Sequence, residues 1–191
     1  YDASKKNNSN IIIRITGDCP LVDPQLIDKF LRIFKKKKVD YLNNIYPPTF
    51  PDGLDIEIFS FQALKKTYKL AKTQYDKEHV TPFMQNSKTL KKLNIKSKID
   101  YSKIRLTVDE EADFEVIKNI FNHFHPNILF NWKDVISLYN NNSVLFKNSE
   151  IKRNEGFYMK KGQKLYKRAK EIIPGGNMLL SKRGEMFLPE K

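Results

Sequence analysis

Cysteine, glycine and long apolar runs are all scarce in this sequence, and each scarcity excludes a class of protein. The one cysteine, Cys19, rules out a disulfide within the chain and fits a reducing compartment. No stretch approaches the roughly 20 apolar residues of a membrane-spanning helix, and no signal-peptide pattern is present. We therefore expect a cytoplasmic protein without a membrane partner. Only Gly17 and Gly53 precede Gly156, so residues 1–155 lack a glycine-rich loop for phosphates.

The charge of the chain is the next feature that constrains function. The sequence holds 35 Lys and Arg against 22 acids, a formal net charge of +13, which invites a nucleic-acid partner. Residues 145–191 alone hold 12 of the bases and 5 of the acids, so more than half of the excess lies there. Aromatic residues do not interleave with basic ones on a predicted strand. We therefore do not expect nucleic acid as a partner, and a basic nucleic-acid-binding module is kept as an alternative function.

The stretch from Ile11 to Pro24, IIIRITGDCPLVDP, is the most informative. Its β-branched run, Ile11–Ile13, predicts a buried strand of a parallel sheet, and the run breaks at Gly17 and Asp18. Ligands of open α/β sheets gather at the carboxyl ends of strands, which would put Asp18 at the rim of a site. A turn residue without function is the alternative. Cys19 is interpreted as a small buried hydrophobe rather than a nucleophile.

The next segments alternate between helical and strand patterns, which is typical of an α/β fold. Asp23, Ser60 and Asn131 are predicted to cap helices at their N-termini. Predicted helices cover residues 24–38, 61–72, 76–85 (interrupted near Pro82) and 110–124, and a last one starts at 132 and precedes a turn-like stretch that begins at Asn140. Predicted strands cover residues 39–42, 54–59, 90–96 and 104–108. The apolar spacing predicts inward-facing side chains at Tyr68, Phe114 and Phe121 among others.

Two predicted strands end in an aspartate, Asp18 and Asp109, and a helix follows each one. If the strands are neighbours, both carboxylates project from the same edge of the sheet. Two oxygen ligands with open positions suit Mg²⁺, which keeps waters and takes substrate phosphates. This pattern indicates phosphoryl or nucleotidyl transfer. Aspartates also follow strands in many other α/β domains, so the spacing alone does not settle the chemistry.

Five segments in a fixed order carry a family resemblance: RITGDCPLVDP, VDYLNN, FPDGLDIEIFS, KEHVTPF and RLTVDEEADFEVI. Over residues 10–140 the chain resembles the cytidylyltransferases of the spore-coat polysaccharide, acylneuraminate and Kdo type. The resemblance implies an α/β, three-layer, Rossmann-like nucleotide-diphospho-sugar transferase fold. It implies activation of a nonulosonic or related acidic sugar as a CMP-sugar for surface polysaccharide. CTP and an acidic sugar would be the partners, and a homodimer is compatible with the family.

The resemblance also implies roles for individual residues. Asp18 and Asp109 match the family's metal aspartates and are the expected catalytic residues, with Asp113 as a supporting acid. The expected substrate-binding residues are Arg14, Pro51, Gly53, Asp55, Glu57, Glu78 and His79.

Several of these residues have a structural interpretation that stays open. Asp55 and Glu57 share one face of a predicted strand and could form its solvated side. His79 could cap a helix or pack against a neighbour. Arg14 and Arg105 could each pair with an acid instead of a phosphate.

One departure from the family pattern predicts that the chain is a fragment. The family grips the triphosphate with a basic, glycine-containing loop after its first strand, and nothing here matches that loop. The first residue is Tyr1, so we expect the N-terminal nucleotide-binding part and most of the cytosine site to precede it. The fragment alone is then expected to be inactive.

The last part of the sequence has a different character, because five of the seven glycines lie at Gly156 or beyond. GQKLYKRAKEIIPGGNMLLSKRGEMFLPEK resembles the start of class III, PLP-dependent aminotransferases of the glutamate-1-semialdehyde aminomutase type. A predicted helix over residues 162–173 followed by Pro-Gly-Gly carries this resemblance, and an ordinary helix stop is the alternative.

These patterns predict three parts: a cytidylyltransferase domain over residues 1–144, a linker over 145–155, and the start of an aminotransferase domain over 156–191. We expect the last part to form a C-terminal helical extension of the α/β fold. The implied parent is bifunctional, and PLP would be bound only by the missing remainder of the aminotransferase. An alternative is that the aminotransferase is the parent's principal activity.

Overall fold

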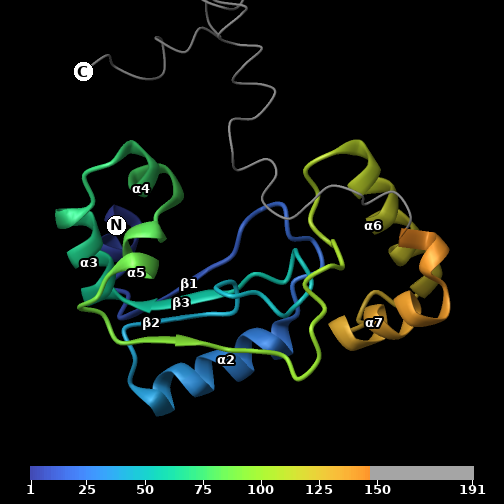
Figure 1. The fold of residues 1–191 in the computed structure, drawn as a ribbon, viewed down its shortest axis with the longest axis horizontal. Helices are drawn as coiled ribbons and strands as arrows, with labels where there is room; N and C mark the ends of the chain where they lie inside the picture. Colours follow the sequence, from blue (N-terminus) through green and yellow to red (C-terminus); the bar gives the residue numbers. More distant parts are fainter. Residues whose placement is uncertain (147–191) are drawn as a thin grey trace, which may run out of the picture. The chain divides into compact units, whose positions relative to one another are not determined.

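Four short strands form one mixed sheet in residues 1–146, the part of the chain that the computed structural model describes (Figure 1). The strands are β1 (Ile11–Arg14), β2 (Tyr41–Asn43), β3 (Glu57–Ser60) and β4 (Lys92–Asn94), in the spatial order β1-β3-β2-β4. β3 runs antiparallel to both β1 and β2, whereas β2 and β4 are parallel. β1, β2 and β4 therefore all point in the same direction.

β1 is an edge strand among the described residues, and the prediction of a buried strand in a parallel sheet is wrong. It pairs antiparallel with β3 in the register Ile12↔Phe59, and Ile13 is 38% exposed. A run of three isoleucines is typical of a strand that is covered on both faces. β-branched residues suit a half-buried edge strand equally well, so this composition does not distinguish the two.

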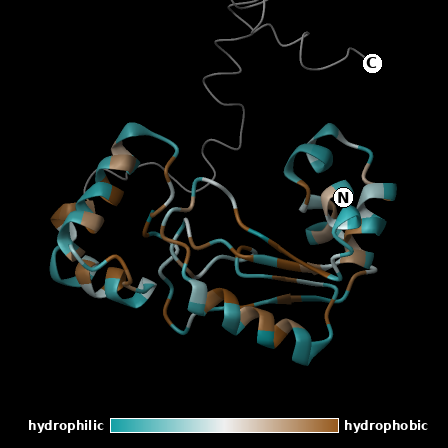
Figure 2. Cartoon of the chain, turned by 180° about the vertical axis from the view of Figure 1, so that it is seen from behind, coloured by the Kyte–Doolittle hydropathy of each residue, from teal (hydrophilic) through white to brown (hydrophobic). Residues whose placement is uncertain are grey.

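Helices cover both faces of the sheet, which confirms the expected three layers. Helix α2 (Pro24–Lys37) covers one face, where Phe30 and Phe34 are buried with Leu42 and Ile58. Helices α3 (Phe61–Leu70) and α5 (Pro82–Asn86) cover the other, where Leu64 and Met84 are buried with Tyr41 and Phe59. Neighbouring residues of a strand point to opposite faces, so β2 and β3 each contribute to both cores. In Figure 2 α2 alternates between hydrophobic and hydrophilic residues along its length.

The predicted helix starts are confirmed by hydrogen bonds. Asp23 Oδ1 accepts from the backbone N–H groups of Gln25 (2.7 Å) and Leu26 (3.1 Å). Ser60 and Asn131 likewise accept from backbone N–H groups of their helices' first turns. Each bond satisfies a donor that a helix N-terminus leaves without a partner in the helix. The helix expected over residues 76–85 is two short helices, α4 (Gln74–His79) and α5.

A third core lies under helices α6 (Glu111–Phe124) and α7 (Trp132–Asn141) and a 3-10 turn, Ser143–Phe146. α7 continues to Asn141, into the stretch from Asn140 onward that was expected to be a turn. Phe146 is buried against the third core. The described fold thus includes Phe146, two residues beyond the predicted boundary at 144. The remaining helix in this part of the chain is α1 (Asp2–Lys6).

Two other predictions are corrected. Residues 104–108 do not form a strand: only Arg105 makes an isolated bridge, with Asp52. The side chains of Tyr68, Phe114 and Phe121, expected inside, are 61%, 54% and 37% exposed. Aromatic residues at helical spacing can lie at the border of the buried stripe, where the sequence does not tell inside from outside.

The predicted linker from residue 147 onward, the predicted helix over 162–173 and the aminotransferase fragment over 156–191 lie outside the described residues. Within residues 1–146, no helix has the length and apolar character needed to cross a membrane.

Candidate active site

The candidate site lies at the edge of the sheet where β1, β2 and β4 end and β3 begins. Backbone pairing aligns one residue from each strand at this edge: Arg14 with Glu57, Glu57 with Asn43, and Asn43 with Asn94. All four side chains are polar, whereas the other residues of the four strands are largely apolar. At this edge the sheet therefore changes from apolar to polar residues, although Asn43 and Glu57 stay buried.

Asp18 lies in a tight turn that follows β1. The backbone N–H of Cys19 donates to the carbonyl of Thr16 (3.3 Å), and Thr16 Oγ1 lies 3.1 Å from Cys19 Sγ. Asp18 is partly exposed, but Cys19 is only 6% exposed. Burial raises the pKa of the Cys19 thiol to about 12, so the thiol is protonated at neutral pH. The predicted burial of Cys19 is confirmed, and the raised pKa agrees with its interpretation as a small hydrophobe.

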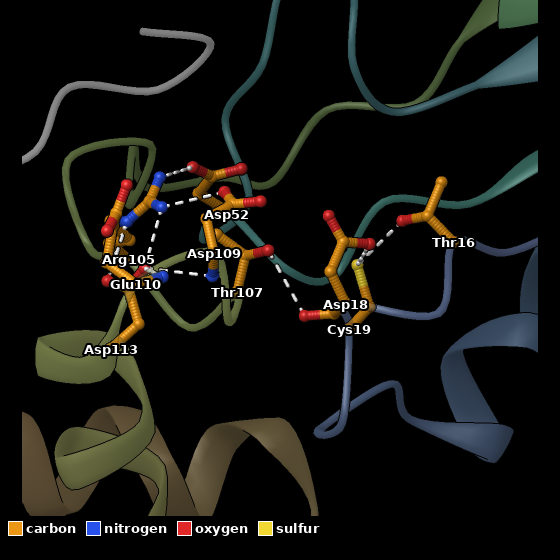
Figure 3. A network of polar contacts seen from close by, with 9 residues as sticks. All are labelled: Thr16, Asp18, Cys19, Asp52, Arg105, Thr107, Asp109, Glu110 and Asp113. Carbon is orange, nitrogen blue, oxygen red and sulfur yellow. Dashed lines mark hydrogen bonds and ion pairs between the residues drawn. The ribbon is translucent and has the colours of Figure 1, made fainter. Parts of the chain in front are cut away.

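The turn at Asp18 and the segment before Asp109 are joined by backbone contacts (Figure 3). The carbonyl oxygen of Asp18 accepts from the backbone N–H of Val108 (2.9 Å) and from Thr107 Oγ1 (3.1 Å). Asp109 is the next residue after Val108. The two aspartates that the sequence singled out therefore lie on adjoining segments, as predicted, although the second segment is extended chain and not a strand.

Gly53 brings a third segment to the same place. Its φ is +100°, and a Cβ added there would lie 2.5 Å from the carbonyl carbon of Leu106. Beside this contact, on either side of Arg105, the N–H of Asp52 donates to the carbonyl of Ile104 (2.9 Å) and the N–H of Leu106 donates to the carbonyl of Asp52 (2.6 Å). Glycine is required here because two backbones approach closely. The close contact at Gly53 and the two backbone bonds of Asp52 thus fix the segment that leads into Asp55 and Glu57, and Pro51 at the start of this segment is buried.

Arg105 organises the acids around Asp109. Its guanidinium donates to both oxygens of Asp113 (2.8 Å each), to Asp109 (2.8 Å) and to Asp52 (3.2 Å). Arg105 and Asp113 are buried, whereas the Asp109 side chain is 40% exposed. Asp113 also accepts from the backbone N–H groups of Asp109 (3.0 Å) and Glu110 (3.1 Å). The predicted alternative for Arg105, pairing with an acid, is confirmed.

This cluster shifts the acid–base equilibria of its members. The hydrogen bond to Asp113 raises the pKa of Arg105. Burial opposes ionisation of Asp113, but hydrogen bonds from Arg105 and from two backbone N–H groups outweigh it, and the pKa of Asp113 lies below its usual range. Asp113 is therefore ionised and fully occupied as an acceptor, and it supports Asp109 through Arg105 and the backbone.

Glu57 lies in a second buried polar cluster. Its carboxylate accepts from Arg14 (2.5 Å) and from the hydroxyl of Tyr41, and Gln85 Nε2 lies 3.5 Å away. Glu57 is 1% exposed, so the solvated-face alternative is wrong for this residue. Burial and the neighbouring carboxylate raise the pKa of Tyr41, which keeps its phenol protonated. Arg14 pairs with an acid, as its alternative predicted.

Asp55 lies near the Asp18 turn: its charge raises the pKa of the Cys19 thiol, and a hydrogen bond with its backbone lowers that pKa. In contrast, Glu78 and His79 end helix α4. Glu78 is exposed, and the His79 ring lies 4.7 Å from the ring of Tyr75. Figure 1 places α4 with α3 and α5, away from α6. The structure thus joins Asp18, Asp55, Gly53 and Asp109 but does not bring Glu78 and His79 to them.

Sequence reasoning assigned no role to Asp52, Tyr41, Gln85 or Thr107. Asp52 is inside the quoted segment FPDGLDIEIFS, and a charged residue between proline and glycine was the available signal. The other three are recognisable only once distant segments are placed together, since their partners are 16 to 89 residues away.

In residues 1–146 no group of three or more His, Cys, Asp or Glu side chains is arranged to hold a metal ion. Asp18 and Asp109 offer two carboxylates on adjoining segments, and both are partly open to solvent. That donor set is insufficient for a closed site such as structural zinc. It fits Mg²⁺, which takes one or two carboxylates and completes its shell with waters and substrate phosphates.

Comparisons with known proteins agree with this geometry. A family model described as Cytidylyltransferase matches residues 1–151. An uncharacterized protein of Methanocaldococcus jannaschii is 39% identical over 127 residues, 65% of this chain and 51% of that protein. The spore coat polysaccharide biosynthesis protein SpsF of Bacillus subtilis is 30% identical over 142 residues, 70% of this chain and 56% of that protein.

A solved structure of a cytidylyltransferase from Leptospira borgpetersenii is similar, with a TM-score of 0.74 and 33% identity. The match covers 80% of this chain and 65% of that one. The chain spans about half the length of the two curated relatives named above. The family match over residues 1–151 and the similarity of the fold show that this chain belongs to the cytidylyltransferase family.

Proposed function

We propose that the protein transfers the cytidylyl group of CTP to a hydroxyl of an acidic sugar and releases pyrophosphate. The sugar oxygen would form a bond to the α-phosphorus, and the bond from that phosphorus to the pyrophosphate oxygen would break. The observation that carries this proposal is the junction of the Asp18 turn with the segment ending at Asp109. The name of the Bacillus subtilis relative supports polysaccharide precursors as the purpose of the reaction.

The role of this chain in that reaction is positioning and charge. Phosphoryl-type transfers depend mainly on aligned reactants and neutralised charge. Asp18 and Asp109 are the residues that would hold Mg²⁺, and the bound ion would supply neutralisation of phosphate charge. Arg105 and Asp113 would fix the Asp109 carboxylate, because both are buried and bonded to it or to its backbone. Arg14 is engaged with Glu57, so we assign it to shaping the site rather than to a phosphate.

The sugar side of the site would be formed by the segment from Pro51 to Glu57. Gly53 seats this segment against residues 104–107, and Asp55 lies near the Asp18 turn. A carboxylate at Asp55 can accept hydrogen bonds from sugar hydroxyls. Glu78 and His79 remain proposed substrate contacts only if the substrate reaches helix α4.

The test is a pyrophosphate-release assay of the full-length protein with CTP, Mg²⁺ and a nonulosonic acid. Asp18→Asn and Asp109→Asn should each lower kcat/KM by about 100-fold or more, because metal-bound charge neutralisation is worth several kcal/mol in such transfers. Asp28→Asn is the control, since Asp28 is exposed on α2.

If both site variants keep the wild-type rate, the metal assignment is wrong. If CTP releases no pyrophosphate with any acidic sugar while a neutral sugar reacts, the sugar class is wrong and the cytidylyl transfer stands.

A further inference from the structure

A second concave surface lies on the α2 side of the sheet. Its walls are helix α2, helix α7 and the chain from Lys96 to Tyr101, and its volume is about 800 Å³. Figure 1 shows α7 beside the N-terminal end of α2. The volume is within the range of sites for small organic ligands. None of the residues that line it belongs to the Arg105 cluster or to the Asp18 turn.

The lining is strongly basic. Lys29 and Arg32 lie three residues apart on α2 and therefore share a face. The other basic side chains that line the pocket are Lys96, Lys98 and Lys133. Among the residues of known position, none of these five cations forms an ion pair with a carboxylate.

The one acid in the lining, Asp23, offsets at most one of these five positive charges. Its carboxylate is buried and accepts three backbone N–H groups: Gln25 (2.7 Å) and Leu26 (3.1 Å) at the start of α2, and Trp132 (3.1 Å) at the start of α7. Asp23 therefore ties the first turns of both walls together. The positive ends of the two helix dipoles meet at Asp23, and its carboxylate is the anion that they stabilise.

Aromatic rings line the same pocket. The ring of Trp132 lies 5.4 Å from that of Phe50 and 6.0 Å from that of Tyr101. Phe50 is buried, whereas Trp132 and Tyr101 are partly exposed in the pocket lining. A flat apolar ring could therefore pack against Trp132 or Tyr101 while its charged groups reach the surrounding lysines.

We propose that this pocket, which we call the basic pocket, binds a small phosphate ester that carries a ring, of the size of a nucleotide or a sugar phosphate. The charge selects an anion, and the aromatic residues select a ring. The wall formed by α2 from Gln25 to Arg32 is only about 10 Å long at 1.5 Å per residue, which suits one such unit rather than a polymer. This site is separate from the proposed catalytic edge and does not depend on the proposed function.

The chain offers a direct reporter, because Trp132 is its single tryptophan. The experiment titrates the full chain with CMP, with glucose 1-phosphate and with inorganic pyrophosphate at low salt, and follows tryptophan fluorescence. We expect a saturable change with the two ring-bearing phosphates and a weaker response to pyrophosphate. Which of the two ring compounds binds more tightly distinguishes a nucleotide site from a sugar phosphate site.

Charge-removing variants test the location. The double variant K29Q/R32Q should raise Kd by about fivefold or more, in line with two exposed charge contacts of up to about 1 kcal/mol each. K35Q/K36Q removes the same charge from the same helix outside the pocket lining and should leave Kd within twofold of the wild type. The double variant D18N/D109N should also keep the response, because the basic pocket does not include that edge.

Four results would overturn the proposal. The first is no fluorescence change with either ring compound at millimolar concentration. The second is an equal loss of affinity in K29Q/R32Q and K35Q/K36Q, which would indicate general attraction to a basic surface. The third is loss of the response in D18N/D109N, which would assign it to the catalytic edge. A single-stranded oligonucleotide that binds far more tightly than CMP would replace the small ligand by nucleic acid.

Discussion

Arg105 is the residue on which the Asp109 side of the site depends. It contacts three aspartates, and two of them, Asp52 and Asp113, are buried. Removing one partner of a buried ion pair leaves an uncompensated charge, which costs more than the pair itself contributes. The effect of Arg105 on stability should therefore be much larger than that of a surface base.

We predict that Arg105→Met lowers the free energy of unfolding by about 3–5 kcal/mol, because Asp52 and Asp113 lose the cation that compensates their burial. Urea denaturation followed by circular dichroism measures this change. Lys118→Met is the matched control: Lys118 forms an exposed ion pair with Glu115, and its loss should change the free energy by less than about 1 kcal/mol. Equal effects of the two substitutions would contradict the role of the cluster.

The pH dependence of the stability of wild type and Arg105→Met checks whether the loss is electrostatic. The pKa of Asp113 is depressed in the folded state, so its contribution is present above the unfolded pKa of about 3.9 and is lost as pH falls through the folded value. The stability difference between wild type and Arg105→Met should therefore be full at neutral pH and shrink below about pH 4. A difference that stays constant with pH would assign the loss to packing instead of charge.

Individual residues were predictable where one local pattern determined their role. Asp23, Ser60 and Asn131 cap helices as their positions indicated, and Cys19 is buried as its small apolar side chain suggested. Glu57 was not predictable as a buried residue. A strand of alternating polar and apolar residues is typical of a sheet with one solvent-exposed face. Glu57 is buried instead because Arg14 and Tyr41, on other strands, donate hydrogen bonds to its carboxylate.

At the scale of elements, residues 104–108 were expected to form a strand. They are extended chain that pairs at one point with the loop from Pro51 to Gly53. Its backbone bonds to Ile104 and Leu106 form the isolated bridge that holds Arg105 in place. The sequence Ile-Arg-Leu-Thr-Val satisfies the local preferences of a strand, but a strand also needs a neighbour along its length. Here the segment contacts Gly53 at Leu106 and the Asp18 turn at Val108. Because these are two different neighbours, no regular ladder of hydrogen bonds forms.

Gly53→Ala should lower the free energy of unfolding by about 1–3 kcal/mol and reduce cytidylyl transfer, since the added methyl group would push residues 104–107 away from the loop. Thermal or urea denaturation measures the first effect and the pyrophosphate assay the second. Gly17→Ala is the control, because no atom lies within 4 Å of the Cβ position and its φ is not in the left-handed region. Gly17→Ala should change stability by no more than about 0.5 kcal/mol. An unaffected Gly53→Ala protein would show that the segment can move without loss.

At the scale of the whole described unit, three buried clusters are stacked along the sheet and beside it. The alternation of helical and strand patterns predicts the class and the layers, because each element buries one face. It does not predict the strand order or the direction of β3, which follow from how distant segments pair. The position of α6 and α7 also escapes prediction, because the contacts that join them to the sheet layers are long-range: Asp23 accepts from the N–H of Trp132, 109 residues away, and the ring of Trp132 packs against Phe50.

Asp23 is therefore where the link between the α2 layer and the α7 layer can be tested. Its two carboxylate oxygens accept from different helices. Oδ1 accepts from two backbone N–H groups in the first turn of α2, and Oδ2 accepts from the N–H of Trp132. Asn has one oxygen, so Asp23→Asn should keep the cap of α2 and leave the Trp132 N–H without its acceptor, at a cost of about 1–3 kcal/mol. Asp23→Ala should cost about 1 kcal/mol more, because the helix cap is lost as well. Urea denaturation followed by both circular dichroism and the fluorescence of Trp132 measures the two steps, with the exposed Asp28→Asn as control. If Asp23→Asn is as stable as the wild type, then α7 is held by its apolar core alone and the link through Asp23 has no energetic role.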